Sequence, residues 1–177
     1  MTLSKAEKVQ SAIENAARKR CARTRLRSSW TSFEGPNLNV FWRLGAFIVS
    51  SVSLMGKELE TDAHVITIEI APDNAKAAED NIRRAEIPPT MEILVGDALK
   101  LIPTLTGTFD LVFIDAEKSE YLSYLKLVED KLHNGSVVVA DNVRHAPSYL
   151  NYVRFSGKYT SRYRSAGWDG LEVSAKR

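Results

Sequence analysis

Hydrophobic and polar positions change their spacing repeatedly along residues 38–177, so that short apolar runs alternate with stretches of helical period. Runs rich in β-branched and other large apolar residues predict buried strands at 64–70, 91–95, 109–115 and 136–142. The run at 109–115 is nearly continuous, which is typical of a central parallel strand covered on both faces. The last two segments, 158–165 and 170–177, alternate with period two and predict an antiparallel pair.

Helical spacing fills the segments between these runs. Residues 71–87 place four apolar residues on one face, with a proline in the first turn: Ala75, Ala78, Ile82 and Ala85, after Pro72. Residues 97–105 predict a short helix interrupted by Pro103, and residues 147–157 a further helix. Residues 119–135 predict a second long helix with these residues facing inward and a glycine at its C-terminal cap: Leu122, Leu125, Val128 and Leu132, then Gly135.

Strands that alternate with helices in this way predict an α/β domain with a mostly parallel sheet. The length of 177 residues suits one such domain, and we expect it to occupy residues 38–177, after an N-terminal helical or basic arm at 1–37. One cysteine excludes a disulfide-stapled scaffold. The longest uncharged apolar stretch, 44–56, is too short to cross a membrane, and no signal pattern opens the chain, so we predict a cytoplasmic protein.

Positive charge is concentrated near the N-terminus. Residues 1–27 contain eight Lys or Arg and only two Glu, whereas the whole chain has a net charge of +2. Such a run is typical of a solvated helix face or a loose arm, and it is also a feature of nucleic-acid binding. A nucleic-acid partner therefore stays an alternative, and it is not the partner we expect.

Each predicted strand ends in a polar residue, and ligands of parallel α/β sheets bind beyond the carboxyl ends of the strands. Glu69 closes the first run and stands where nucleotide-binding domains place the carboxylate that binds ribose. Gly45 precedes Glu69 by 24 residues, close to the spacing between a glycine turn and such a carboxylate. The alternative is that Glu69 is a solvated strand end.

The ends of the next two strands predict a cation site. Asp115 and Asp141 are 26 residues apart, one strand–helix–strand unit, so neighbouring strands would bring them together with Asn142. Two carboxylates and an amide oxygen are hard ligands suited to Mg²⁺. Lys118 follows on the same loop, where a partly desolvated amine is able to act as a base. The alternative is that both aspartates cap the helices that follow them.

Several of these segments resemble the cation-dependent O-methyltransferases, the family of catechol and caffeoyl-CoA O-methyltransferases and small bacterial and archaeal relatives. The resemblance rests on VITIEIAPDNAKAAEDNIRRA, GDALKLIPTL, FDLVFIDAEKSEYLSYLKLV and VVVADNV. It runs from about residue 44 to the C-terminus. It implies a Rossmann-like class I methyltransferase fold, with a seven-stranded, mostly parallel sheet, its last strand antiparallel and helices on both faces.

The resemblance also implies a role for each matching position. S-adenosylmethionine would be bound through Gly45, Ser51, Glu69, Ile70, Gly96, Asp97, Ala98 and Asp115. A divalent cation, Mg²⁺ or similar, would be held by Asp115, Asp141 and Asn142, with Lys118 as the catalytic base. The implied activity is methyl transfer to a hydroxyl of a small, catechol-like molecule, by a homodimer that needs no membrane.

Two positions depart from the family pattern. Arg43 stands where relatives have an acidic residue, two positions before the first glycine, and Val49 stands where they have a further glycine. A β-branched residue is restricted in its side-chain rotamers and disfavours positive φ, so it occupies space next to the methionine part of the cofactor. Two alternatives follow: a protein of this fold that binds without catalysis, and an RNA-directed methyltransferase that uses the basic arm.

Overall fold

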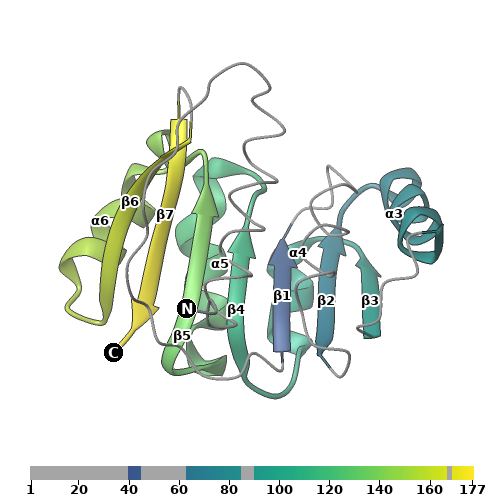
Figure 1. Cartoon of the computed structure of the whole chain (residues 1–177), viewed down its shortest axis with the longest axis horizontal. Helices are drawn as coiled ribbons and strands as arrows, with labels where there is room; N and C mark the ends of the chain where they lie inside the picture. Colours follow the sequence, from purple (N-terminus) through teal and green to yellow (C-terminus); the bar gives the residue numbers. More distant parts are fainter. Residues whose placement is uncertain (1–39, 45–62, 85–89, 167–168) are drawn as a thin grey trace, which may run out of the picture.

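A computed structural model of the chain describes residues 40–44, 63–84, 90–166 and 169–177. Its strands form one sheet in the order β3-β2-β1-β4-β5-β7-β6 (Figure 1). The strands are β1 (Val40–Leu44), β2 (His64–Glu69), β3 (Thr90–Val95), β4 (Phe109–Ile114), β5 (Leu132–Asp141), β6 (Tyr159–Ala166) and β7 (Asp169–Lys176). Strands β1 to β5 pair in parallel, and β7 is antiparallel to both β5 and β6. The predicted α/β class and the antiparallel C-terminal pair are confirmed.

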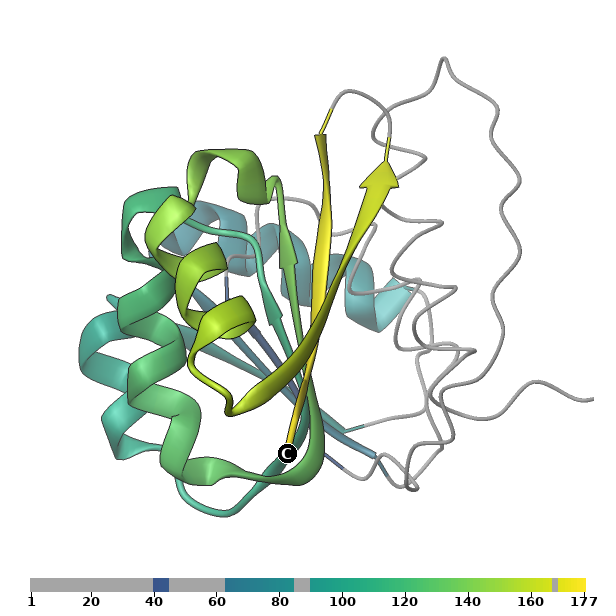
Figure 2. The same ribbon diagram turned by 90° about the vertical axis from the view of Figure 1, so that its left-hand side faces the viewer.

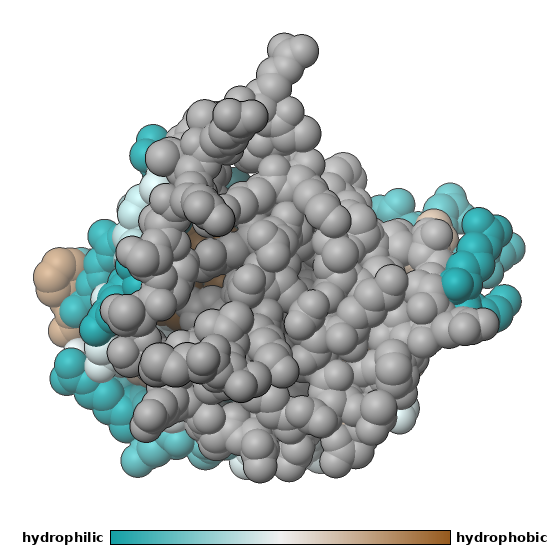
Figure 3. Space-filling model, viewed as in Figure 1, coloured by the Kyte–Doolittle hydropathy of each residue, from teal (hydrophilic) through white to brown (hydrophobic). Residues whose placement is uncertain are grey.

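The helices lie between the strands as the sequence predicts. They are α3 (Pro72–Arg84), α4 (Ala98–Leu101), α5 (Tyr121–Val128) and α6 (Pro147–Phe155), with 3₁₀ turns η1 (Ile102–Thr104), η2 (Lys118–Glu120), η3 (Glu129–Lys131) and η4 (Val143–His145). Figure 2 shows α4, α5 and α6 against one face of the sheet. Helix α3 lies at the β3 end, where it presents a hydrophilic surface (Figure 3).

Apolar side chains are buried on both faces of the central strand. Val112 and Ile114 of β4 belong to the core cluster beneath α5 and α6, whereas Leu111 and Phe113 belong to a cluster on the opposite face. Alternate residues of a strand point to opposite faces, so a strand covered on both sides needs an apolar residue at every position. This explains the continuous apolar run in the sequence.

The helix predicted at 119–135 is shorter than expected. Helix α5 ends at Val128, and β5 begins at Leu132, so Gly135 lies within a strand and is not a helix cap. The buried residues of α5 are Tyr121, Tyr124, Leu125 and Val128, while Leu122 is only partly buried. The apolar pattern favours leucines for the inner face of the helix, but two tyrosines lie there as well, since their rings are apolar and only their hydroxyls need partners.

The predicted arm at 1–37 lies outside the described residues, so the structure does not test the proposed boundary. In the part of the chain that is described, no helix is long and apolar enough to cross a membrane.

Candidate functional site

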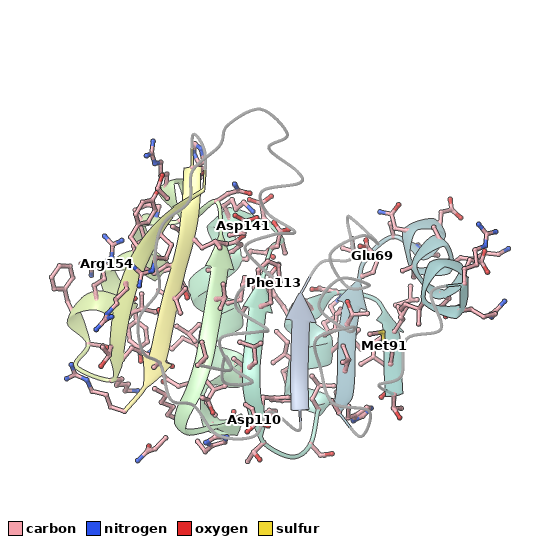
Figure 4. The ribbon with its side chains drawn as sticks, viewed as in Figure 1. Glu69, Met91, Asp110, Phe113, Asp141 and Arg154 are labelled. Atoms are coloured by element: carbon pink, nitrogen blue, oxygen red, sulfur yellow. The ribbon has the colours of Figure 1, made fainter. Side chains whose placement is uncertain are left out.

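A cavity of about 690 Å³ opens at the carboxyl ends of the parallel strands. In the sheet, β2 and β3 lie on one side of β1, whereas β4 and β5 lie on the other, so the order of the strands changes direction at β1. The cavity lies at this change of direction. Figure 4 shows Glu69 and Asp141 at this edge, with Asp110 at the opposite edge. The described residues that line the cavity are Ile68, Glu69, Ile70, Gly96, Asp97, Ala98, Asp115, Ala116, Glu117, Lys118, Glu120, Tyr124 and Asn142.

Glu69, the last residue of β2, is almost completely buried. Its Oε1 atom accepts a hydrogen bond from the backbone N–H of Ala71 at 2.8 Å, which fixes the carboxylate at the cavity wall. Ile70 follows it outside the strand and is 73% exposed, an unusual exposure for a large apolar side chain. A buried carboxylate beside an apolar surface suits a ribose next to an adenine ring.

The turn after β3 forms the neighbouring wall. Gly96 has φ +151°, a backbone conformation that favours glycine, and its N–H donates to the Glu69 carbonyl at 2.9 Å. Asp97 is the N-cap of α4, since its Oδ1 accepts from the Leu99 N–H at 2.9 Å. The turn therefore holds Asp97 and Ala98 against the cavity beside Glu69.

Asp115 and Asp141 follow neighbouring positions of two paired strands. Ile114 of β4 is in register with Ala140 of β5, so the two aspartates are next to each other at the sheet edge. Both are nearly buried. Burial, and then the negative charges of Asp115 and Asp141, raise the pKa of the Tyr121 hydroxyl. Asp115 is not the cap of the next helical turn, because Glu117 caps η2.

Asn142 has φ 53°, the left-handed conformation that asparagine tolerates better than most residues. Its N–H donates to Oδ1 of Asp141 at 2.8 Å, and Asn142 lines the cavity that Asp115 also lines. Within the described residues no three His, Cys, Asp or Glu side chains are grouped as a metal site, but the predicted set needs only two carboxylates. The hard oxygen donors at this edge fit a divalent cation.

Lys118 extends from η2 toward the same point. Its Nζ atom donates to Oδ1 of Asp115 at 3.3 Å and to the Tyr121 hydroxyl at 2.6 Å. The Tyr121 hydroxyl donates in turn to the backbone carbonyl of Asp141 at 2.9 Å. The side chain of Lys118 is 25% exposed, so its amine is partly desolvated and still open to the cavity.

The structure adds residues that the sequence did not single out. Glu117, Glu120 and Tyr124 line the cavity, and Tyr124 donates a short hydrogen bond to Oε2 of Glu120. Burial, and then this bond, raise the pKa of Tyr124. All three lie in the segment that carries the family resemblance, and the signal that could have found them is their helical spacing after Asp115.

The structure brings together eight predicted residues that line the cavity: Glu69, Ile70, Gly96, Asp97, Ala98, Asp115, Lys118 and Asn142. Asp141, beside Asp115 at the sheet edge, is buried and is not among the residues that line the cavity. Gly45 and Ser51 lie outside the described residues, as does Val49. Arg43 lies in β1, paired with Thr67 and Phe113.

Comparison with known proteins agrees with this geometry. The sequence model of a family described as O-methyltransferase matches residues 38–151. The chain is 34% identical to catechol O-methyltransferase of Sus scrofa over 137 residues, which cover 72% of this chain and 74% of that protein. It is 42% identical to catechol O-methyltransferase of Mycobacterium tuberculosis over 80 residues, which cover 45% of this chain and only 36% of that protein.

The fold also matches that of solved structures. An O-methyltransferase from Bacillus cereus, crystallised in complex with SAH, superposes with a TM-score of 0.75 at 17% identity, covering 99% of this chain and 83% of that one. In open α/β sheets ligands bind beyond the carboxyl ends of the strands, which is where the cavity of this chain lies. The chain belongs to the O-methyltransferase family.

Proposed function

We propose that this protein is an S-adenosylmethionine-dependent O-methyltransferase that transfers a methyl group to a hydroxyl of a small, catechol-like molecule with the help of a divalent cation. The observation that carries the proposal is the convergence of Glu69, Asp115, Lys118 and Asn142 on one cavity in a member of this family. We also propose the class I arrangement for the seven strands of its sheet, a boundary near residue 38, a cytoplasmic location and a homodimer.

The cofactor half of the cavity is the side nearest β2 and β3. Glu69 would accept hydrogen bonds from the ribose hydroxyls, and Ile70 with Ala98 would supply apolar contacts to the adenine. Gly96 and Asp97 would line the adenine edge, whereas Gly45 and Ser51 would contact the methionine part. The complex of the Bacillus cereus relative with SAH supports a cofactor of this kind.

The acceptor half is the side nearest β4 and β5. Asp115, Asp141 and Asn142 would hold the cation. When bound, the cation supplies positive charge that orients two adjacent acceptor oxygens and lowers the pKa of the acceptor hydroxyl. The catechol O-methyltransferases among the relatives support an acceptor with adjacent hydroxyls.

Lys118 would then receive the hydroxyl proton. The acceptor oxygen forms its bond to the methyl carbon as the bond from sulfur to that carbon breaks, and sulfur keeps the electron pair. The proton lost by the hydroxyl becomes the third N–H of the Lys118 ammonium, so atoms and charge balance. Alignment of the oxygen, methyl carbon and sulfur supplies much of the rate acceleration, because the reaction needs little other chemistry.

The test is methyl transfer from S-adenosylmethionine to catechol-type acceptors, measured with Mg²⁺ and with excess EDTA. We expect turnover by the wild type only with the cation, and no cation-dependent turnover by Asp141→Ala. The matched control is Asp110→Ala, which removes an aspartate from the opposite edge of the same sheet. Full activity of Asp141→Ala in EDTA would overturn the proposal.

A further inference from the structure

Tyr121 is a fully buried tyrosine whose hydroxyl lies between the predicted base and a predicted metal ligand. It is the first residue of α5, and its ring packs edge-on against Tyr149 with 5.9 Å between ring centroids. Packing of the ring fixes the hydroxyl, which donates to the Asp141 carbonyl. A tyrosine hydroxyl has one proton, so it faces Lys118 only as a hydrogen-bond acceptor.

The amine of Lys118 consequently has two fixed acceptors, the Tyr121 hydroxyl at 2.6 Å and Oδ1 of Asp115 at 3.3 Å. An unprotonated amine carries two N–H bonds and one lone pair. When both N–H bonds point to these acceptors, the lone pair takes the remaining tetrahedral direction. Lys118 also lines the cavity, and in the proposal that follows this remaining direction is the one that faces the acceptor hydroxyl.

We infer that Tyr121 is a positioning residue, which orients the lone pair of Lys118 toward the acceptor hydroxyl and ties the base to the end of β5. This inference rests on the proposed function, since it gives Lys118 the role of base. Tyr121 touches neither cofactor nor acceptor in this account and acts through Lys118 alone. A side chain with four rotatable bonds, as lysine has, otherwise samples many orientations, and misplacement of a catalytic group is costly in rate.

The kinetic test compares Tyr121→Phe with the wild type. We expect kcat to fall about ten- to a hundredfold while the KM values for cofactor and acceptor stay the same, since only orientation of the base is lost. In a Lys118→Met background the same substitution should cost nothing further. A further fall in kcat when Tyr121→Phe is added to Lys118→Met would overturn the inference. So would an unchanged kcat in Tyr121→Phe alone. The control is Tyr149→Phe, which removes the hydroxyl of an equally buried tyrosine.

A second readout needs no activity. The protonated form of Lys118 would keep the same two acceptors, and lysine ammonium groups held by hydrogen bonds give sharp ¹H–¹⁵N signals, whereas mobile ones exchange with water. We expect the Lys118 signal, assigned with Lys118→Arg, in the wild type and in Tyr149→Phe but not in Tyr121→Phe. Lys176, whose Nζ donates to two backbone carbonyls at 2.7 Å, is the internal reference. An identical Lys118 signal in Tyr121→Phe would overturn the inference.

The two proposals fail differently. Absence of methyl transfer by the wild type would refute the proposed function but leave the spectroscopic result to decide whether Tyr121 holds Lys118. Active wild type with an unaffected Tyr121→Phe would refute the inference and leave the proposed function standing.

Discussion

Oδ1 of Asp115 accepts a hydrogen bond from Nζ of Lys118 at 3.3 Å, three residues further along the chain. The contact joins the residue after β4 to the 3₁₀ turn η2 and brings an amine and a buried carboxylate to the same cavity. It places the proposed base beside a proposed ligand of the divalent cation, which is the basis of the first prediction.

Substitution of Lys118 by methionine should lower kcat about a hundredfold or more, because a positioned base contributes that order of rate. The loss should be smaller for an acceptor whose hydroxyl is already acidic, such as a nitrocatechol, since that hydroxyl needs less help in losing its proton. Steady-state kinetics with the two acceptors checks this. Equal losses for both acceptors would show that Lys118 is not the base.

Asn142 allows its amide to be separated from its backbone conformation. Asn142→Gly removes the amide but keeps the left-handed backbone, so we expect Mn²⁺ affinity to fall about tenfold or more with little loss of stability. Asn142→Ala should bind Mn²⁺ as weakly and lose about 1 kcal/mol of stability as well. Titration followed by electron paramagnetic resonance measures the affinity. Unchanged Mn²⁺ affinity in both variants would exclude Asn142 as a ligand.

Arg154 of α6 pairs with Glu172 of β7 through two hydrogen bonds, of 2.8 and 2.6 Å, and Glu172 is completely buried. Arg154→Met would leave a buried carboxylate without its cation, so the free energy of unfolding should fall by about 3 kcal/mol. Urea denaturation measures the change. Arg84→Met, at the exposed end of α3, is the control and should change stability little. A loss below about 1 kcal/mol in Arg154→Met would contradict this account.

His133 makes stability depend on pH. Its protonated ring donates through Nδ1 to the Asn134 carbonyl at 2.9 Å and through Nε2 to Oδ1 of Asp110 at 2.7 Å, and these contacts raise its pKa above 6.5. A raised folded-state pKa stabilises the protein below the unfolded value, and the gain is lost as pH rises through the folded value. The stability lost in His133→Gln should therefore be larger at pH 5.5 than at pH 9, by less than about 1 kcal/mol at this partly exposed site.

Urea titrations of both proteins at the two pH values provide the check for His133. The same difference in stability at acid and alkaline pH would show that the ring does not gain from its charged form.

The order of strands and helices from β2 onward could be predicted from the sequence, because the period of the apolar residues changes from one element to the next, whereas β1 (Val40–Leu44) was not among the predicted runs. Asp115 and Asp141 could be paired from their spacing alone, since one strand–helix–strand unit separates neighbouring parallel strands. The inner face of α5 could not, because Tyr121 and Tyr124 are amphipathic and an apolar pattern favours the leucines beside them. The end of α5 was misplaced because Leu132 continues the helical spacing although it begins β5.

The contacts of the site lay beyond the sequence for a different reason. The hydrogen bond from Tyr121 to the Asp141 carbonyl joins residues 20 positions apart, and its acceptor is backbone, which has no residue-type signature. Asp97 lines the cavity as the resemblance implies, and its side chain is also the N-cap of α4, a second role that was not predicted.

The most direct test of the central claim is calorimetric titration of S-adenosylmethionine into the wild type, with and without Mg²⁺, and into Glu69→Gln. We expect the wild type to bind in the low micromolar range and Glu69→Gln to bind about tenfold more weakly, because the charged acceptor for ribose is lost. Absence of binding by the wild type at millimolar cofactor would contradict the central claim.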